Sequence, residues 1–208
     1  MANRVRIKFC GMTREEDIAY ATALGVDAIG LIFAPESSRS ISLSQAKKLL
    51  QNRPPFVDLV AVLVNPNPAL VEDIINELGI TLLQFHGDES AEFCNQFAKP
   101  YIKALHVHST ARFYEDSAKY QQASALLLDT PSAKSRGGTG KTFDWELIPN
   151  NFDKPLILAG GLDATNVNSA VELCSPYAVD VCSGVEVSPG IKDHEKMKAF
   201  VSTLWGKI

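Results

Sequence analysis

A cysteine near the N-terminus is placed to act as a base. The strand-like segment 4–9 leads into Cys10, and alternation along a strand puts Lys8 and Cys10 on one face, opposite Ile7 and Phe9. A nearby ammonium favours the thiolate over the thiol, and the thiolate is the form that accepts a proton. Many cysteines are simply small core residues. The position at a strand end, above Lys8, favours the reactive alternative.

A carboxyl group could supply the matching acid. Asp129 ends the apolar segment 125–128. The sequence alone leaves two readings open, since aspartate at a strand end serves either as a turn or cap residue or as a catalyst. Facing Cys10 across a shared site, it would complete an acid–base pair, in which each group typically contributes roughly 10²–10⁴-fold to the rate.

Two glycine-containing segments could bind a phosphate. Gly160 and Gly161 follow one apolar segment, and Ser183 and Gly184 follow the next. Where side chains are missing, backbone N–H groups can approach phosphate oxygens closely, aided by a helix N-terminus. Each segment alone is also typical of a tight turn, but the two together favour an anion site.

Other polar residues are weaker candidates. His86 ends an apolar segment and is either a substrate contact or a structural histidine, while Asp180 shares an inward face with Lys8 and can pair with it. His106 and His108 have an H-x-H spacing without evident partner ligands, so we expect no metal there.

The glycine-rich segment 137–142 ends like a nucleotide-binding P-loop. The full pattern needs a glycine five residues before Gly140, where this chain has Ser135. We therefore expect a mobile loop that could close over a substrate, and no nucleotide site.

These candidates fall within a repeated unit of apolar strand, turn and amphipathic helix. The predicted strands cover residues 4–9, 28–33, 57–64, 82–85, 101–105, 125–128, 155–159 and 178–181. The predicted helices cover residues 14–24, 44–51, 69–77, 91–97, 165–174 and 194–204, with weaker candidates at 110–120 and 143–147. Thr13 with Glu16 predicts a capping box, and Ser42 and Asn67 before Pro68 predict similar helix starts.

Eight strands alternating with helices predict a single (β/α)₈ TIM barrel, with residues 1–208 as one catalytic domain. In such barrels the active site lies at the C-terminal ends of the strands, and phosphate is often held after strands 7 and 8. An open doubly wound sheet is the alternative. Against it, the turn Cys10-Gly-Met-Thr lacks the G-x-G-x-x-G dinucleotide fingerprint.

The composition is that of a globular protein. The chain has 208 residues, 46% hydrophobic residues and a formal net charge of −4, which gives no reason to expect a nucleic-acid partner. Its apolar runs fall short of the roughly 20 residues of a membrane helix, so we expect no membrane association. Met1 leads directly into a strand without a secretory signal, and the cysteines lack CxxC pairs. These features predict a cytoplasmic protein with free thiols.

Taken in order along nearly the whole chain, the motifs resemble those of the phosphoribosylanthranilate isomerase family. They are Lys8-Phe-Cys10-Gly-Met-Thr13, Ser38-Arg39-Ser-Ile41, Val62-Leu-Val-Asn65, Gln84-Phe-His86-Gly-Asp-Glu89, Asp129, Gly137-Gly-Thr-Gly140, Phe143-Asp-Trp145, Leu158-Ala-Gly-Gly-Leu162, Asp180-Val-Cys-Ser-Gly-Val-Glu186 and Gly190-Ile-Lys-Asp193. Each motif alone is weak, but the set is specific.

The resemblance implies an Amadori rearrangement in tryptophan biosynthesis, with Asp129 as general acid and Cys10 as general base. It implies that Arg39 meets the anthranilate carboxylate. An aldose-to-ketose shift needs one acid, one base and an anion clamp, but no cofactor. The residues expected to bind the substrate are Lys8, Arg39, Gln84, His86, Gly160, Gly161, Ser183 and Gly184.

Two departures from the family pattern stand out: Ser38 replaces a frequent proline before Arg39, and Cys182 replaces a frequent serine. Cys182 is either a harmless neighbour of Ser183 or a second oxidisable thiol. Two other functions remain possible. One is the histidine-pathway aldose–ketose isomerase, although Cys10 stands where that family has an acid. The other is a non-catalytic barrel that binds a phosphorylated ligand. The sequence is compatible with a monomer or a homodimer.

Overall fold

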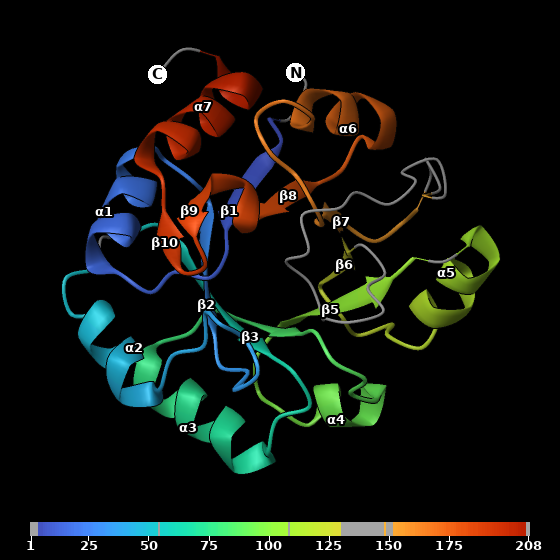
Figure 1. The fold of residues 1–208 in the computed structure, drawn as a ribbon. Helices are drawn as coiled ribbons and strands as arrows, with labels where there is room; N and C mark the ends of the chain where they lie inside the picture. The colour runs from blue at the N-terminus through green and yellow to red at the C-terminus, as the bar shows by residue number, and fades with distance from the viewer. Residues whose placement is uncertain (1–3, 54, 108, 130–147, 149–151, 207–208) are drawn as a thin grey trace.

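The structure, a computed structural model, describes residues 4–53, 55–107, 109–129, 148 and 152–206. Across these residues, eight parallel strands close into a barrel in which β8 pairs with β1 (Figure 1). The strands are β1 (Arg6–Phe9), β2 (Ala28–Ile32), β3 (Asp58–Leu63), β4 (Leu82–Phe85), β5 (Tyr101–His106), β6 (Ala125–Asp129), β7 (Leu156–Leu158) and β8 (Ala178–Val181). The predicted barrel is confirmed, and closure rules out the open sheet because an open sheet would leave two edge strands unpaired.

Helices surround the barrel on its outer side (Figure 1). They are α1 (Glu15–Ala23), α2 (Leu43–Leu49), α3 (Pro68–Leu78), α4 (Ala91–Asn95), α5 (Thr110–Ser117), α6 (Val167–Cys174) and α7 (His194–Trp205). After β8 the chain forms a short 3₁₀ turn, η2 (Ser183–Val185), and a small hairpin of β9 (Glu186–Ser188) and β10 (Ile191–Lys192) that the sequence reading did not predict. The predicted helix at 143–147 and the glycine-rich loop 137–142 lie outside the described residues.

Two of the three predicted helix starts are confirmed. Ser42 forms a reciprocal capping box with Gln45 at the start of α2, and Asn67 caps α3 with Pro68 in its first turn. The capping box at Thr13 is wrong. Helix α1 begins one residue later, without a side-chain cap, because the Thr13 hydroxyl donates instead to the carbonyl oxygen of Gly190.

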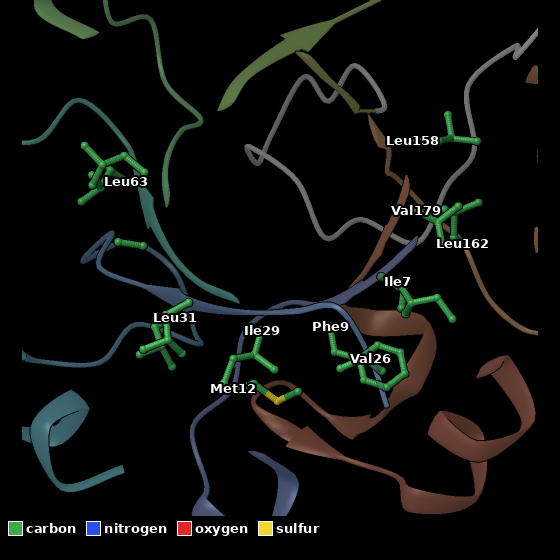
Figure 2. Packing of buried hydrophobic residues seen from close by; sticks show 14 of the residues in the cluster. Ile7, Phe9, Met12, Val26, Ile29, Leu31, Leu63, Leu158, Leu162 and Val179 are labelled. Atoms are coloured by element: carbon green, nitrogen blue, oxygen red, sulfur yellow. The ribbon is translucent and has the colours of Figure 1, made fainter. Parts of the chain in front are cut away.

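The main core lies between the barrel and the helices. Alternate strand residues such as Ile7, Phe9 and Ile29 are fully buried and point toward the helical layer (Figure 2). The opposite set of strand residues fills the barrel interior, and near β1 this inner set consists of Cys10, Val60 and Val62. The predicted inward orientation of Cys10 is therefore confirmed. Among the described residues, no helix is both long and apolar enough to cross a membrane.

Candidate active site

A cavity opens at the carboxyl ends of the strands. It is lined by most of the residues that the sequence singled out: Cys10, Arg39, Gln84, His86, Asp129, Gly160, Gly161 and Ser183. The chain thus brings side chains from β1, β4, β6, β7 and β8 to one rim, as parallel strands of a closed barrel must. Two predicted residues, Lys8 and Gly184, do not line this cavity.

Lys8 lies beneath the cavity and pairs with Asp180, as the sequence suggested. Its ammonium is 2.9 Å from Asp180 Oδ1, and both side chains are nearly inaccessible. Burial by itself would lower the pKa of Lys8, but the negative charges of Asp180 and Cys10 outweigh burial and raise it. A Cβ on Gly30 would lie 2.9 Å from Cys10 Sγ and 3.1 Å from Lys8 Nζ, so this glycine leaves the space that both groups use.

Cys10 has a second thiol as its neighbour. The hydrogen bond from Cys182 lowers the pKa of Cys10 to about 6, against the opposing effect of burial and with the help of the Lys8 charge. A thiol with this pKa is largely ionised at neutral pH, which makes Cys10 able to accept a proton. From the sequence, Cys182 was a departure from the family pattern and either a harmless neighbour of Ser183 or a second oxidisable thiol, with no predicted contact to Cys10.

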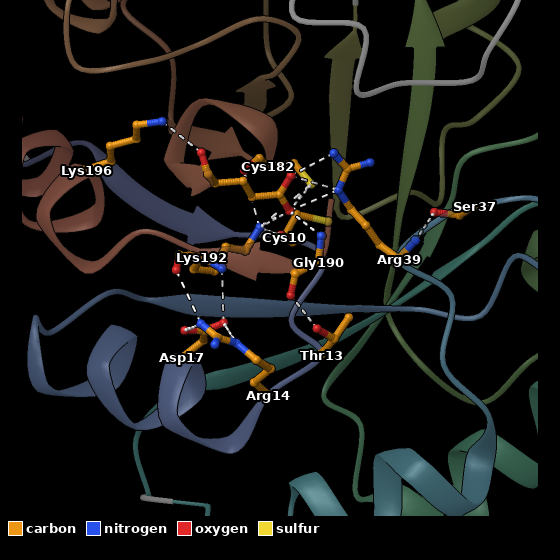
Figure 3. Close-up of polar contacts among 11 residues, drawn as sticks. Cys10, Thr13, Arg14, Asp17, Ser37, Arg39, Cys182, Gly190, Lys192 and Lys196 are labelled. Atoms are coloured by element: carbon orange, nitrogen blue, oxygen red, sulfur yellow. Dashed lines mark hydrogen bonds and ion pairs between the residues drawn. The ribbon is translucent and has the colours of Figure 1, made fainter. Parts of the chain in front are cut away.

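A buried carboxylate joins two cations above Cys10. Glu186 accepts hydrogen bonds from the Arg39 guanidinium at 2.7 to 3.1 Å and from Lys192 Nζ at 2.8 Å. Lys192 also donates to the carbonyl oxygens of Cys10 at 2.5 Å and of Cys182 at 3.3 Å (Figure 3). Burial would raise the pKa of Glu186, but its hydrogen bond from Arg39 and the charge of Lys192 lower it overall.

This group of three residues carries a net charge of one positive unit. Because Arg39 lines the cavity and is held by a bidentate contact to Glu186, the excess positive charge is fixed at the cavity wall. Neither Glu186 nor Lys192 was predicted from the sequence to belong to the site. Each of them stands inside a longer sequence motif without any feature that marks it as functional. Their partner Arg39 lies 147 residues away from Glu186 in the chain.

Asp129 stands on the other side of the cavity, at the end of β6. His86 Nε2 lies 3.1 Å from Asp129 Oδ2, and Gln84 Nε2 lies 3.0 Å from His86 Nδ1. With the Gln84 amide as donor, a neutral imidazole carries its proton on Nε2 and donates it to Asp129. All three side chains are buried, so His86 both lines the cavity and fixes the carboxyl group.

The loops after β7 and β8 meet closely. Gly160 and Gly161 have φ values of 84° and 65°, a left-handed conformation that glycine adopts without strain. A Cβ on Gly184 would lie 1.9 Å from the carbonyl oxygen of Leu162, so only glycine fits where the two loops touch. Gly184 therefore brings Ser183 beside the β7 loop, although it does not line the cavity itself.

Of the weaker candidates, His86 and Asp180 belong to the site, whereas His106 does not line the cavity. His106 ends β5 and does not line the cavity, and its H-x-H partner at 108 lies outside the described residues. Among the described residues, no three His, Cys, Asp or Glu side chains are grouped so as to hold a metal ion. The fold and the site define a (β/α)₈ barrel with a reactive thiol and a carboxyl group facing one cavity.

Comparison with known proteins identifies the family of the chain. The family model of N-(5'-phosphoribosyl)anthranilate (PRA) isomerase matches residues 7–203, and the chain belongs to this family. It is 59% identical over 204 residues to N-(5'-phosphoribosyl)anthranilate isomerase of Legionella pneumophila strain Paris, covering 98% of this chain and 99% of the relative. The chain is thus an aldose–ketose isomerase of tryptophan biosynthesis, which argues against the histidine-pathway and non-catalytic alternatives.

Solved structures agree with this assignment. The crystal structure of phosphoribosyl anthranilate isomerase from Thermotoga maritima has a TM-score of 0.89 and 40% sequence identity, covering 97% of this chain and 99% of that chain. A second structure of a phosphoribosyl anthranilate isomerase holds reduced 1-(o-carboxyphenylamino)-1-deoxyribulose 5-phosphate. It has a TM-score of 0.86 and 38% identity, and covers 97% of this chain and 99% of that chain.

Proposed function

We propose that the chain catalyses the Amadori rearrangement of N-(5-phospho-β-D-ribosyl)anthranilate to 1-(2-carboxyphenylamino)-1-deoxy-D-ribulose 5-phosphate, with Asp129 as general acid and Cys10 as general base. Asp129 gives a proton to the furanose ring oxygen as its bond to C1 breaks and the anilino nitrogen forms a Schiff base. The Cys10 thiolate then removes the proton on C2. The electron pair moves toward the iminium nitrogen, and the resulting enolamine tautomerises to the ketone.

One observation carries these roles. Cys10 and Asp129 line the same cavity from β1 and β6, and Cys10 has its pKa lowered to about 6. A base with a pKa near the working pH is both ionised and basic enough to take a proton from carbon. The rearrangement needs an acid at the ring oxygen and a base at C2, and the site offers one group of each kind on separate strands.

The rest of the cavity fits the two anionic ends of this substrate. Arg39 belongs to a group with one excess positive charge and would meet the anthranilate carboxylate. The phosphate would lie against Gly160, Gly161 and Ser183, whose loops meet at Gly184. A relative binds the reduced product, which carries both a carboxylate and a phosphate.

The other expected contacts act close to these groups. Gln84 and His86 line the cavity beside Asp129 and would hold it toward the ring oxygen. Lys8 is buried beneath Cys10 and would act through that thiolate instead of through the substrate.

The proposal extends to the setting of the enzyme. We expect one catalytic domain, because the family match runs from residue 7 to residue 203 and the first strand pairs with the eighth. A biosynthetic enzyme acting on a small phosphorylated molecule is expected to work in the cytoplasm. Light scattering coupled to size exclusion distinguishes the monomer from the homodimer.

Single substitutions at the acid and the base test the roles. Phosphoribosylanthranilate is formed in situ and its anthranilate fluorescence is followed after enzyme is added. Cys10→Ala and Asp129→Asn should each lower kcat by about 10²–10⁴-fold while binding of the reduced product is kept. Cys174→Ala, which removes a buried thiol on α6, is the matched control and should keep full activity. Unchanged turnover in either site variant refutes its role.

A further inference from the structure

Cys10 and Cys182 are neighbours across two adjacent strands. In the parallel pair of β1 and β8, Phe9 lies opposite Val181, and the Cys10 N–H donates to the Val181 carbonyl at 2.9 Å. The next residue of each strand is therefore a cysteine, on backbones about 4.8 Å apart. Both cysteines pack in the same inner cluster as Val62. The two thiols thus meet at the base of the cavity.

Charged groups reach this pair from every element packed around it. Lys8 on β1 and Asp180 on β8 lie below it and compensate each other. Above it, the Arg39, Glu186 and Lys192 group adds a net positive charge. His86 and Asp129 face it from the far side of the cavity. The surroundings therefore favour one thiolate in the pair, since one negative charge is stabilised and a second would repel it.

Contacts to nitrogen and oxygen atoms decide which sulfur ionises. Cys10 Sγ and Lys8 Nζ both lie against Gly30, within about 3 Å of the position that a Cβ atom would take there. Cys10 therefore has the Lys8 ammonium as its neighbour. Cys182 Sγ lies between two opposite charges, 3.9 Å from Lys192 Nζ and 3.8 Å from Glu186 Oε1, so the ammonium is offset there and the carboxylate disfavours a second anion. These contacts place the negative charge on Cys10 and leave the proton on Cys182.

The Cys182 thiol has two acceptors within reach, Glu186 Oε1 at 3.8 Å and the Cys10 sulfur. Glu186 Oε1 already accepts from Arg39 Nε at 2.9 Å, Lys192 Nζ at 2.8 Å and Gly190 N at 3.2 Å. A thiol proton adds little to an oxygen with three nitrogen donors, whereas the neighbouring thiolate gains a charge-assisted hydrogen bond.

We propose that Cys182 is a positioning residue for the base: its thiol donates a hydrogen bond to the Cys10 sulfur, which orients that sulfur and holds it as the thiolate. The proposal rests on the assignment of Cys10 as general base. A serine at this position could donate the same hydrogen bond, because a hydroxyl is also a donor.

The titration behaviour of the pair agrees with this geometry. The hydrogen bond from Cys182 is the largest influence on Cys10 and lowers its pKa to about 6, while the same bond, together with burial, raises the pKa of Cys182 well above its usual value. The remaining thiols titrate far from this range. Burial raises the pKa of Cys94 to about 12 and that of Cys174 to about 11.

A thiolate titration of the free enzyme tests the proposal. The ultraviolet absorbance of thiolate and the rate of alkylation by iodoacetamide are followed against pH, and the Cys10→Ala trace identifies the Cys10 signal. Loss of a hydrogen bond to a charged acceptor in Cys182→Ala should raise the pKa of Cys10 by about 1–2 units. Cys182→Ser should recover most of this shift, and Cys174→Ala should show none. The acidic limb of the pH dependence of kcat/KM should move with the thiolate pKa.

Two results would overturn the proposal. One is an unchanged Cys10 pKa in folded Cys182→Ala, and the other is a serine variant that behaves like the alanine variant, since packing alone would then explain the change. Circular dichroism confirms folding, and the serine variant keeps the test open if the alanine variant does not fold. The titration measures the pKa of Cys10 without any turnover, so its result can refute the role of Cys182 and leave the proposed function intact. The role of Cys10 as general base is refuted only if Cys10→Ala remains active.

Discussion

Glu186→Gln is the sharpest perturbation of the site, because it removes one charge and almost no volume. Glu186 is 5% exposed and lies between the Arg39 guanidinium and the Lys192 ammonium. The substitution leaves two cations side by side, and the glutamine amide can accept from only one side. Burial with bidentate contacts makes this carboxylate a structural anchor for Arg39 as well as a charge partner.

The expected loss follows from burial. Removing one partner of a buried ion pair typically costs about 3–5 kcal/mol, because the remaining charge is left without compensation. Lys192 is wholly inaccessible and Arg39 is 12% exposed, so water can compensate only a small part of the charge left behind. Glutamine fills the same space, which removes any cavity contribution. We therefore expect the free energy of unfolding to fall by about 3–5 kcal/mol at neutral pH.

The pH dependence gives the prediction a sign. The pKa of Glu186 is lowered from its ordinary value of 4.5, so its contribution is complete above pH 4.5 and is lost as the pH falls through the lower, folded-state value. Wild type and Glu186→Gln should therefore differ most at neutral pH and converge in acid.

Urea unfolding at a series of pH values measures the difference. Glu115→Gln is the matched control, because Glu115 is 64% exposed and pairs with Arg112 at the surface, where such pairs contribute about 0–1 kcal/mol. The reasoning would be refuted if Glu186→Gln lowered the free energy of unfolding no more than Glu115→Gln does. It would also be refuted if the difference in stability between wild type and Glu186→Gln stayed the same in acid.

Two further predictions concern the loops and the thiol pair. In Gly184→Ala the new methyl group would meet the Leu162 carbonyl, so the β7 and β8 loops must separate. We expect KM to rise about tenfold or more from a lost phosphate contact, measured by the fluorescence assay, and a normal KM would show that this junction does not shape the site. Diamide should oxidise Cys10 and Cys182 to a disulfide as it is itself reduced to the hydrazine, since β-strand neighbours fit disulfide spacing. Peptide mass spectrometry and recovery of activity by dithiothreitol check this, and equal, reversible inactivation of Cys182→Ala would contradict it.

The barrel could be predicted because its pattern is local. The segment 57–64 became β3 (Asp58–Leu63) and the segment 82–85 became β4, since apolar runs between turns set strands almost without tertiary information. Capping at Ser42 depends on residues three apart and was predicted correctly. Thr13 has the same local pattern but meets Gly190, 177 residues further on, and that contact overrides the pattern.

The same distinction separates the parts of the site. The position of Cys10 and Asp129 at the cavity could be predicted, because strand ends form the active-site rim in this fold. The group of Glu186 with its two cations could not, because its members come from the β2 loop and from a hairpin after β8, and no local spacing relates them. An acidic residue soon after the apolar segment of β8 is the signal that could have identified Glu186.

Placing the proposed acid, Asp129, and the proposed base, Cys10, on separate strands would let the barrel tune their pKa values independently. The groups that set the charge of Cys10 come from β1, β8 and the hairpin, whereas the contacts described for Asp129 come through His86 and Gln84 from β4. A thiolate touching the carboxylic acid would take its proton and leave neither group in its working form. Because the cavity lies between them, a substrate can receive a proton at its ring oxygen and lose one at C2 while each group keeps the state its own surroundings impose. Substitution of Cys182 should therefore move only the limb of the pH profile that reports the base.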